Sequence, residues 1–183
     1  MDTVFAVHRG YDESNASQVF FGLISRCLNV FHTPDNKSGH ILKAYQDFMQ
    51  YEGVPQSLHR DLVPEQKIDK IIQINRDMRV KDTWSEAKHP NQNPAEQGGV
   101  RILKAGVDGL LDRTGAPPEL WPWAYSYIAD INNHCASKFL GWRTPIEKQH
   151  GYMPDISPFL FYMFWEQIYF KTDEYTSDTK DIS

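Results

Sequence analysis

Cysteine is scarce in this sequence, which contains only Cys27 and Cys135. Two cysteines exclude a disulfide framework and a zinc site made of cysteines. No apolar run approaches the roughly 18 residues of a membrane-spanning helix, and residues 1–20 lack the basic-then-apolar pattern of a secretion signal. We therefore expect a reduced, intracellular protein in the nucleus or cytoplasm, with no membrane association.

An excess of basic residues is also missing. The chain has 19 lysines and arginines against 24 aspartates and glutamates, a formal net charge of −5. Proteins that bind nucleic acid usually carry a basic face. A role on DNA therefore requires either a basic surface elsewhere in a longer protein or weak binding by this chain.

What is present is typical of a single globular α/β domain. The chain has 183 residues, 40% of them hydrophobic and 13% aromatic, which excludes a disordered chain. Alternating and helical patterns predict strands at residues 3–7, 19–24, 27–31, 58–61 and 78–80, and helices at 37–51, 64–75, 93–112, 119–137 and 144–149. This order fits a ribonuclease-H-like fold, a mixed five-stranded sheet flanked by helices with its first and fourth strands adjacent.

Three carboxylates, Asp2, Asp61 and Glu96, come from three separate segments. Carboxylate oxygens bind hard divalent cations, and two such ions about 3.5–4 Å apart can activate a hydroxyl and stabilise a leaving phosphate oxygen. Each residue also has a structural interpretation: a charge at a chain end, a cap of the next helix, and a partner of a helix dipole. Among 24 acidic residues, spacing alone does not decide between these interpretations, so the flanking residues must.

Four stretches carry a resemblance to a known family. They are His-Pro-Asn-Gln-Asn-Pro-Ala-Glu at 89–96, Gly-Ala-Pro-Pro-Glu-Leu-Trp at 115–121, Thr-Pro-Ile-Glu at 144–147 and Gly-Tyr-Met-Pro-Asp-Ile-Ser at 151–157. In this order they make the chain, from Asp2 to about Phe170, resemble the catalytic core of retroelement integrases of the Ty1/copia retrotransposon type. Each motif is weak alone, and their order makes the resemblance specific.

The resemblance implies removal of terminal nucleotides from element DNA, followed by attack of the new 3′-hydroxyl on a target phosphodiester. Asp2, Asp61 and Glu96 would be the catalytic and metal-binding residues of a two-ion site. Magnesium is the expected ion, with manganese as a substitute, since all ligands are oxygens. The expected partners are element and target DNA and further copies of the chain, in a homodimer or higher homo-oligomer.

Four further residues are candidate DNA contacts. By the resemblance, His89 lies on a loop that faces DNA, and Asn93 lies one helical turn before the glutamate. Arg101 and Lys104 follow on the same predicted helix and could contact phosphates, although basic residues on a helix are usually only solvated.

Departures from the family pattern lead to further expectations. Gly98 and Gly99 stand where relatives usually continue with basic helix formers, and each glycine costs about 1 kcal/mol relative to alanine, which predicts a weakened helix behind Glu96. The zinc-binding His/Cys module and the basic carboxy-terminal domain of these integrases are not in the sequence, which suggests a fragment. We divide it into a core at 1–137, a post-core segment at 138–170 and a polar tail at 171–183.

The functional alternatives remain open at this point. The chain is an integrase core, or a degenerate core with non-specific metal-dependent nicking, or a catalytically silent remnant that serves for oligomerisation or weak nucleic-acid binding. A frayed start would weaken Asp2 as a ligand, and a Met1 amino group with a pKa near 7.7–8.0 would place a competing positive charge beside it. The aromatic residues of 121–127 and 159–170 either pack on the core or leave an associating surface.

Overall fold

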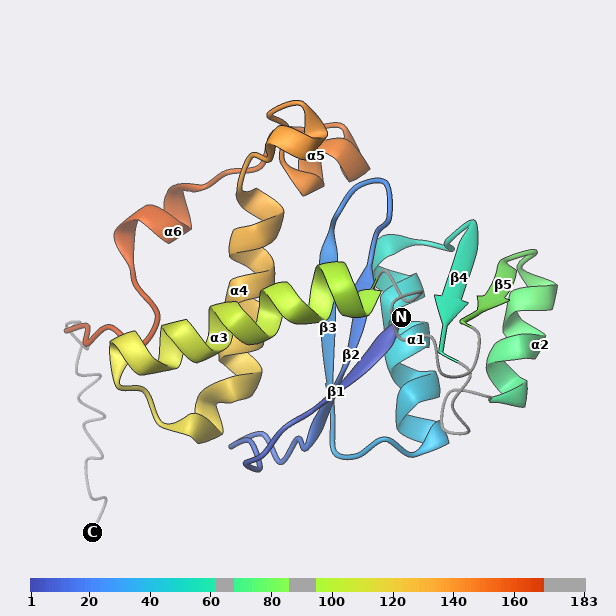
Figure 1. The fold of residues 1–183 in the computed structure, drawn as a ribbon, viewed down its shortest axis with the longest axis horizontal. Coiled ribbons are helices and arrows are strands. Elements are labelled where there is room, and N and C mark those ends of the chain that lie inside the picture. The colour runs from blue at the N-terminus through green and yellow to red at the C-terminus, as the bar shows by residue number, and fades with distance from the viewer. Residues whose placement is uncertain (62–67, 86–94, 170–183) are drawn as a thin grey trace, which may run out of the picture.

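The computed structural model describes residues 1–61, 68–85 and 95–169, with the side chains of Glu96 and Gln97 excepted. Figure 1 shows their arrangement. No helix within these residues is long and apolar enough to cross a membrane. The predicted polar tail at 171–183 lies outside the described residues.

Three strands form an antiparallel sheet in the order β1-β2-β3: β1 (Asp2–Phe5), β2 (Ala16–Phe21) and β3 (Leu28–Thr33). Gly22 N donates to Cys27 O at 2.9 Å and closes the turn between β2 and β3. β3 is one of the two edge strands of this sheet. The Asn133 side chain of α4 (Trp121–His134) lies against it, accepting from Leu28 N at 2.8 Å and donating to Leu28 O at 2.7 Å.

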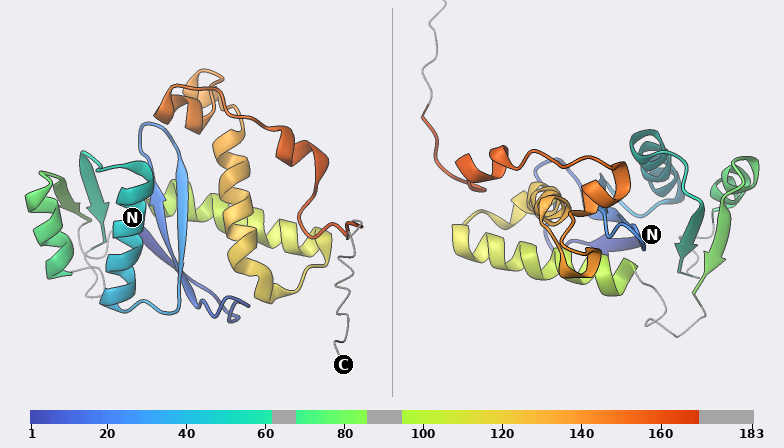
Figure 2. Two further views of the ribbon diagram at one scale, coloured as in Figure 1. Left: turned by 180° about the vertical axis from the view of Figure 1, so that it is seen from behind. Right: turned by 90° about the horizontal axis from the view of Figure 1, so that it is seen from above.

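Helices cover both faces of this sheet, as Figure 2 shows from two further directions. Because side chains alternate along a strand, Val19 and Phe20 point to opposite faces. Val19 belongs to a buried cluster with α3 (Arg101–Thr114) and α4, and Phe20 belongs to a second cluster with α1 (Ser38–Glu52). The three-stranded sheet therefore lies between two apolar cores.

A second, two-stranded sheet replaces the remainder of the predicted five-stranded one. β4 (Ser57–Arg60) pairs in parallel with β5 (Lys81–Trp84). The helix α2 (Asp69–Asp77) lies between the two strands in the sequence. The mixed α/β character is confirmed, but the five strands divide into sheets of three and two. The Met1 nitrogen donates to His59 O at 2.7 Å, so the start of β1 lies beside β4, as the expected order requires.

The predicted strand at 78–80 is wrong. Met78 N donates to Ile74 O and Val80 N to Asn75 O, so these residues close the end of α2. Arg79 takes a positive φ of 58°, which an extended strand does not allow. The chain becomes extended only at Lys81, and β5 begins there.

The carboxy-terminal part consists of short helices joined to the core at two places. The predicted helix at 119–137 is divided into η4 (Pro118–Leu120) and α4, and η5 (Lys138–Leu140), α5 (Pro145–His150) and α6 (Ser157–Phe161) follow. In α5, Gln149 bonds Ser25 and Glu52. After α6, the Phe164 ring lies 5.4 Å from that of Tyr127 on α4. The division of the chain into a core at 1–137, a post-core segment at 138–170 and a polar tail at 171–183 stays a prediction.

Candidate functional site

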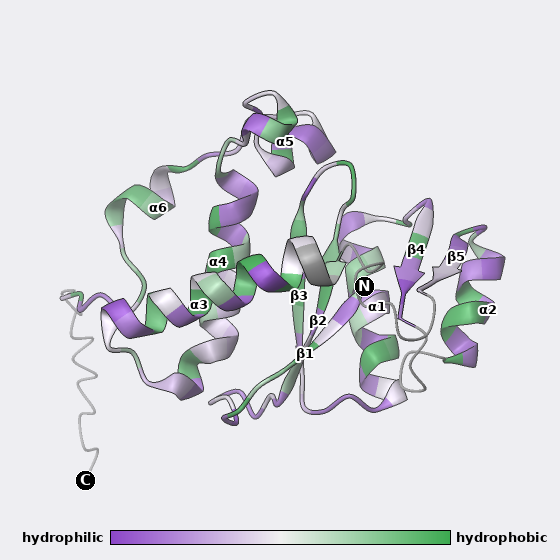
Figure 3. Ribbon diagram, in the orientation of Figure 1, coloured by the Kyte–Doolittle hydropathy of each residue, from purple (hydrophilic) through white to green (hydrophobic). Residues whose placement is uncertain are grey.

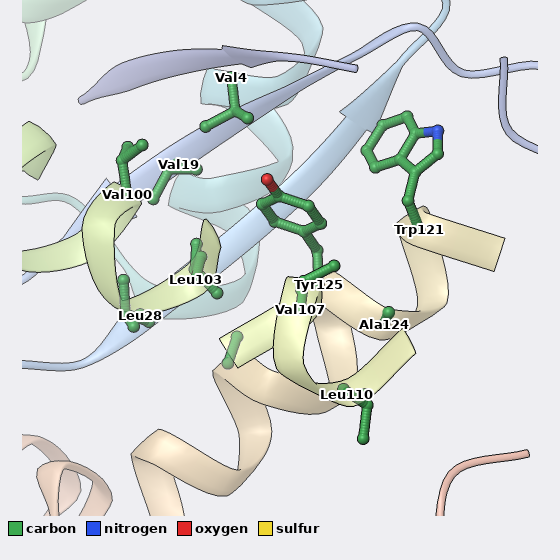
Figure 4. Close-up of a cluster of buried hydrophobic side chains, with 11 residues drawn as sticks. Val4, Val19, Leu28, Val100, Leu103, Val107, Leu110, Trp121, Ala124 and Tyr125 are labelled. Atoms are coloured by element: carbon green, nitrogen blue, oxygen red, sulfur yellow. The ribbon is translucent and has the colours of Figure 1, made fainter. Parts of the chain in front are cut away.

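Asp2 begins β1 on the face of the sheet that α3 covers. Residues two apart on a strand share a face, so Asp2 points to the same side as Val4. Val4 is 2% exposed and packs with Val100 and Leu103 (Figure 4). Thr3 N donates to Asp2 Oδ1 at 2.7 Å. The Asp2 carboxylate therefore lies at the end of the face that receives the segment after Glu96.

Asp61 follows β4 directly and points to the corresponding side. Leu58 of β4 packs in the cluster that contains Phe20 and α1. His59 therefore points away from α1, and Asp61 lies two residues further along the same alternation. Ser85 Oγ donates to Asp61 Oδ1 at 2.9 Å, and Ser85 N donates to Arg60 O at 2.9 Å.

The Met1 nitrogen connects the two carboxylates. Its pKa is lowered from 8.0 to about 6, mainly because burial disfavours its charge, while Asp2 and Asp61 both act in the opposite direction. Both carboxylates thus lie within electrostatic reach of one atom, which bonds to His59 O. Two of the three predicted site residues thus lie on the segments that the Met1–His59 hydrogen bond joins.

The same nitrogen bears on one expectation. Burial lowers the pKa of the Met1 amino group from 8.0 to about 6, which weakens the predicted positive charge beside Asp2. The physical reason is that Met1 is only 5% exposed and packs in the α1 core. Its hydrogen bond to His59 O ties down the start of β1, contrary to the expected fraying.

Glu96 is the second residue of η3 (Ala95–Val100), a π-helical segment that continues into α3 and contacts β1 and β2. Its side chain lies outside the described residues. Gly98 and Gly99, which follow Glu96, allow close packing against the sheet. A Cβ on Gly98 would lie 2.7 Å from Phe21 Cε1, and one on Gly99 2.9 Å from Leu28 Cδ2. The expectation that these glycines only weaken the helix therefore missed their effect, which is to let η3 approach the sheet closely.

A polar network beside Asp61 was missed by the sequence analysis. The His59 ring contacts Thr83 Oγ1 through Nδ1 at 2.9 Å and Ser85 Oγ through Nε2 at 3.0 Å. A signal was present, because His-Arg-Asp at 59–61 and Thr-Trp-Ser at 83–85 both alternate polar side chains on one side of a strand. Without the correct bounds of β5, these two patterns could not be paired.

The DNA-contact candidates divide into two groups. His89 and Asn93 lie outside the described residues. Arg101 and Lys104 are both exposed in the first turn of α3, directly after η3. The exposed charges further along α3 are those of Asp108, Asp112 and Arg113, so the rest of the helix carries charges of both signs.

Within the described side chains, no group of three or more histidine, cysteine, aspartate or glutamate residues is placed to hold a metal ion. Asp2 and Asp61 supply two carboxylates, and a third would have to come from Glu96, whose backbone lies in the segment that contacts β1. Two carboxylates on one side of neighbouring strands fit the oxygen donors that magnesium prefers.

Comparison with solved structures identifies the fold. The chain is similar to the HTLV-2 integrase catalytic core domain in complex with magnesium in its trimeric form, with a TM-score of 0.61 and 15% identity over 81% of this chain and 93% of that one. It is also similar to the catalytic core domain of BIV integrase, with a TM-score of 0.62 and 17% identity over 81% and 90% of the two chains. The chain has the fold of a retroviral integrase catalytic core.

A third similar structure is a simian T-cell lymphotropic virus intasome in complex with PP2A regulatory subunit B56 gamma. Its TM-score is 0.69 at 14% identity, and the match covers 86% of this chain but 56% of that one. The chain thus spans about half of that protein and nearly all of the two core domains. No family model and no curated protein matches the sequence. The integrase-core fold is therefore shown by structure, and the Ty1/copia type is not confirmed.

Proposed function

We propose that this chain is the catalytic core of a retrotransposon integrase, a metal-dependent polynucleotidyl transferase and endonuclease that acts on DNA. The observation that carries the proposal is the placement of Asp2 and Asp61. They come from the two strands that meet at Met1, and both interact with its nitrogen. This arrangement occurs in a fold shared with a core domain solved in complex with magnesium. DNA integration would place the protein in the nucleus or cytoplasm.

Asp2, Asp61 and Glu96 would hold magnesium or manganese in this proposal. The bound ions would activate a water or a 3′-hydroxyl and stabilise the leaving oxygen. The chain's own contribution is to fix the carboxylates. Thr3 N holds Asp2 Oδ1 at 2.7 Å, and Ser85 Oγ holds Asp61 Oδ1 at 2.9 Å. In this proposal the two carboxylates share the bound ions, which would relieve the repulsion between ionised carboxylates.

DNA is the proposed substrate, and the exposed Arg101 and Lys104 are its proposed contacts together with His89 and Asn93. Phosphate contacts of this kind position DNA without reading its sequence. Because the chain carries a net charge of −5, its affinity for DNA should be low and should decrease further with salt. A partner surface or a further domain would then supply most of the binding energy.

The function is tested by following thermal unfolding and DNA nicking in the presence of magnesium or manganese. The native chain should be stabilised by metal, by about 2.7 kcal/mol at one hundred times the dissociation constant. Asp61→Asn should abolish both the stabilisation and the nicking, because it removes one of the paired carboxylates.

Asp108→Asn is the matched control, since Asp108 is an exposed acidic residue on α3 away from the paired carboxylates. It should keep the metal-dependent stabilisation. If the native chain and both variants respond to metal alike, the metal site lies elsewhere. If none responds, the chain is a silent remnant and the integrase proposal fails.

A further inference from the structure

One polar row runs across the two-stranded sheet and ends at Asp61. In the parallel register, His59 lies beside Thr83 and Arg60 beside Trp84. Ser85 N donates to Arg60 O at 2.9 Å and extends the pairing by one residue, so Asp61 lies beside Ser85. Neighbours in a parallel register point to the same face. The four side chains of the row are those of His59, Asp61, Thr83 and Ser85.

The directions of two hydrogen bonds in this row follow from the carboxylate at its end. An ionised carboxylate only accepts, so the Ser85 hydroxyl donates its single hydrogen to Asp61 Oδ1, at 2.9 Å. Ser85 Oγ must then accept from His59 Nε2, 3.0 Å away. The other ring nitrogen, Nδ1, contacts Thr83 Oγ1 at 2.9 Å, and the Thr83 hydroxyl also donates to Leu58 O at 3.3 Å.

The row is built on a fixed frame. Ser85 is only 5% exposed. On the opposite face, the fully buried Arg60 forms an ion pair with Asp82, and its guanidinium lies 4.0 Å from the centre of the Trp84 ring. Because these contacts join β4 to β5, the position of the Ser85 hydroxyl relative to Asp61 is set by the sheet and not by a flexible loop.

The order of the row excludes a nucleophilic serine. In a hydrolytic triad, histidine accepts the serine proton and the carboxylate orients the histidine. Here Ser85 lies between His59 and Asp61, and its proton is directed to the carboxylate. The serine therefore supports the carboxylate.

We propose that Ser85, supported by His59, is a positioning residue for Asp61 as a metal-binding carboxylate. This inference rests on the proposed function. By holding Oδ1, the Ser85 hydroxyl fixes the rotation of the carboxylate, and His59 fixes the rotation of the hydroxyl. Groups that orient a metal-binding side chain in this way typically change metal affinity by about 10–100-fold when they are removed.

The experiment measures the binding of Mn²⁺ by titration calorimetry to the native chain and to three serine variants. Ser85→Ala should lower the affinity about 10–100-fold, and Ser85→Thr should restore most of it because the hydroxyl is kept. Ser126→Ala is the matched control, because its hydroxyl also contacts a histidine Nε2, that of His32, at 2.9 Å. It should leave Mn²⁺ affinity unchanged.

A second measurement requires no metal. The ¹⁵N chemical shifts of His59 should show the hydrogen on Nε2 in the native chain, and Ser85→Ala should change the balance between the two tautomers. His59→Leu, which leaves Ser85 in place, should lower Mn²⁺ affinity less than Ser85→Ala does. If Ser85→Ala does not fold, the Mn²⁺ affinity of His59→Leu still tests the positioning role.

The outcomes separate the two proposals. An Nε2 that carries no hydrogen, or native affinity in Ser85→Ala while Asp61→Asn loses all binding, would overturn the positioning role and leave the integrase proposal intact. A native chain that binds no Mn²⁺ in a way that depends on Asp61 would overturn both, even with the Nε2 tautomer present. The Nε2 tautomer together with loss in Ser85→Ala and rescue in Ser85→Thr supports both.

Discussion

Single residues within η3 control how closely the segment that carries Glu96 lies to the sheet. Gly98 faces the Phe21 ring, with room for a hydrogen but not for a methyl group. A helix propensity scale includes only the conformational cost of glycine, about 1 kcal/mol relative to alanine. The contact with Phe21 should make alanine less favourable than glycine at this position, because overpacking costs about 1–3 kcal/mol.

Gly98→Ala should therefore destabilise the protein, by up to about 2 kcal/mol in chemical denaturation, after the gain in propensity is subtracted from the overpacking cost. Gly109→Ala is the matched control on α3, because a Cβ at that position would meet nothing within 4 Å. It should stabilise the protein by about 0.5–1 kcal/mol. Equal effects of the two substitutions would show that η3 can move away from Phe21 without cost.

At the scale of elements, a histidine of the sheet forms a hydrogen bond with α4. His32 of β3 contacts Ser17 Oγ of β2 at 2.7 Å and Ser126 Oγ of α4 at 2.9 Å. Burial lowers the pKa of His32 below its usual value of 6.5. Burial thus disfavours the protonated ring in the folded protein, and the unfolded chain takes up a proton more readily.

Stability should consequently fall as the pH is lowered through about 6.5, because the unfolded state then binds a proton that the folded state does not. At higher pH both states are neutral at His32 and its contribution is constant. His32→Gln should flatten the slope of unfolding free energy between pH 7 and 5.5, measured by denaturant titration at each pH. A slope unchanged by the substitution would assign it to other groups.

The accuracy of the sequence predictions also differs from element to element. The helix predicted at 37–51 is α1, Ser38–Glu52, because its amphipathic spacing and the stop at Gly53 are local properties. The end of α2 and the start of β5 depend on Arg79, whose backbone is in the left-handed region. The pattern of apolar residues does not predict such a conformation. The division into two sheets and the row from His59 to Ser85 depend on pairings between distant residues, which periodicity does not contain.

At the scale of the whole molecule, apolar side chains gather on the outside of the carboxy-terminal segment. Figure 3 shows that α6 is largely hydrophobic. One side of this segment packs on α4 through Phe159 and Phe164. The exposed aromatic residues on and after α6 are Phe161, Tyr162, Trp165 and Tyr169. Such a surface favours association, and one of the similar core domains has been solved in both a trimeric and a dimeric form.

Sedimentation of the native chain should accordingly show a concentration-dependent oligomer. Phe161→Ser together with Tyr169→Ser should shift it toward monomer, since self-complementary apolar patches stabilise symmetric dimers. Tyr11→Ser is the control, because Tyr11 is a comparably exposed aromatic residue, at 62%, outside this segment. A native chain that is monomeric at high concentration would contradict the proposed oligomer.

The amide of Asn133 has a consequence for the behaviour of the chain at high concentration. It offers one acceptor and one donor to Leu28, in the manner of a single residue of a neighbouring strand. The exposed edge of a sheet is a template onto which another chain can add, and proteins cover such edges to avoid aggregation. By occupying the backbone groups of Leu28 from within the same molecule, Asn133 shortens the stretch of β3 that could nucleate a fibril. The association that we expect would then proceed through side chains of the carboxy-terminal segment and leave the sheets separate.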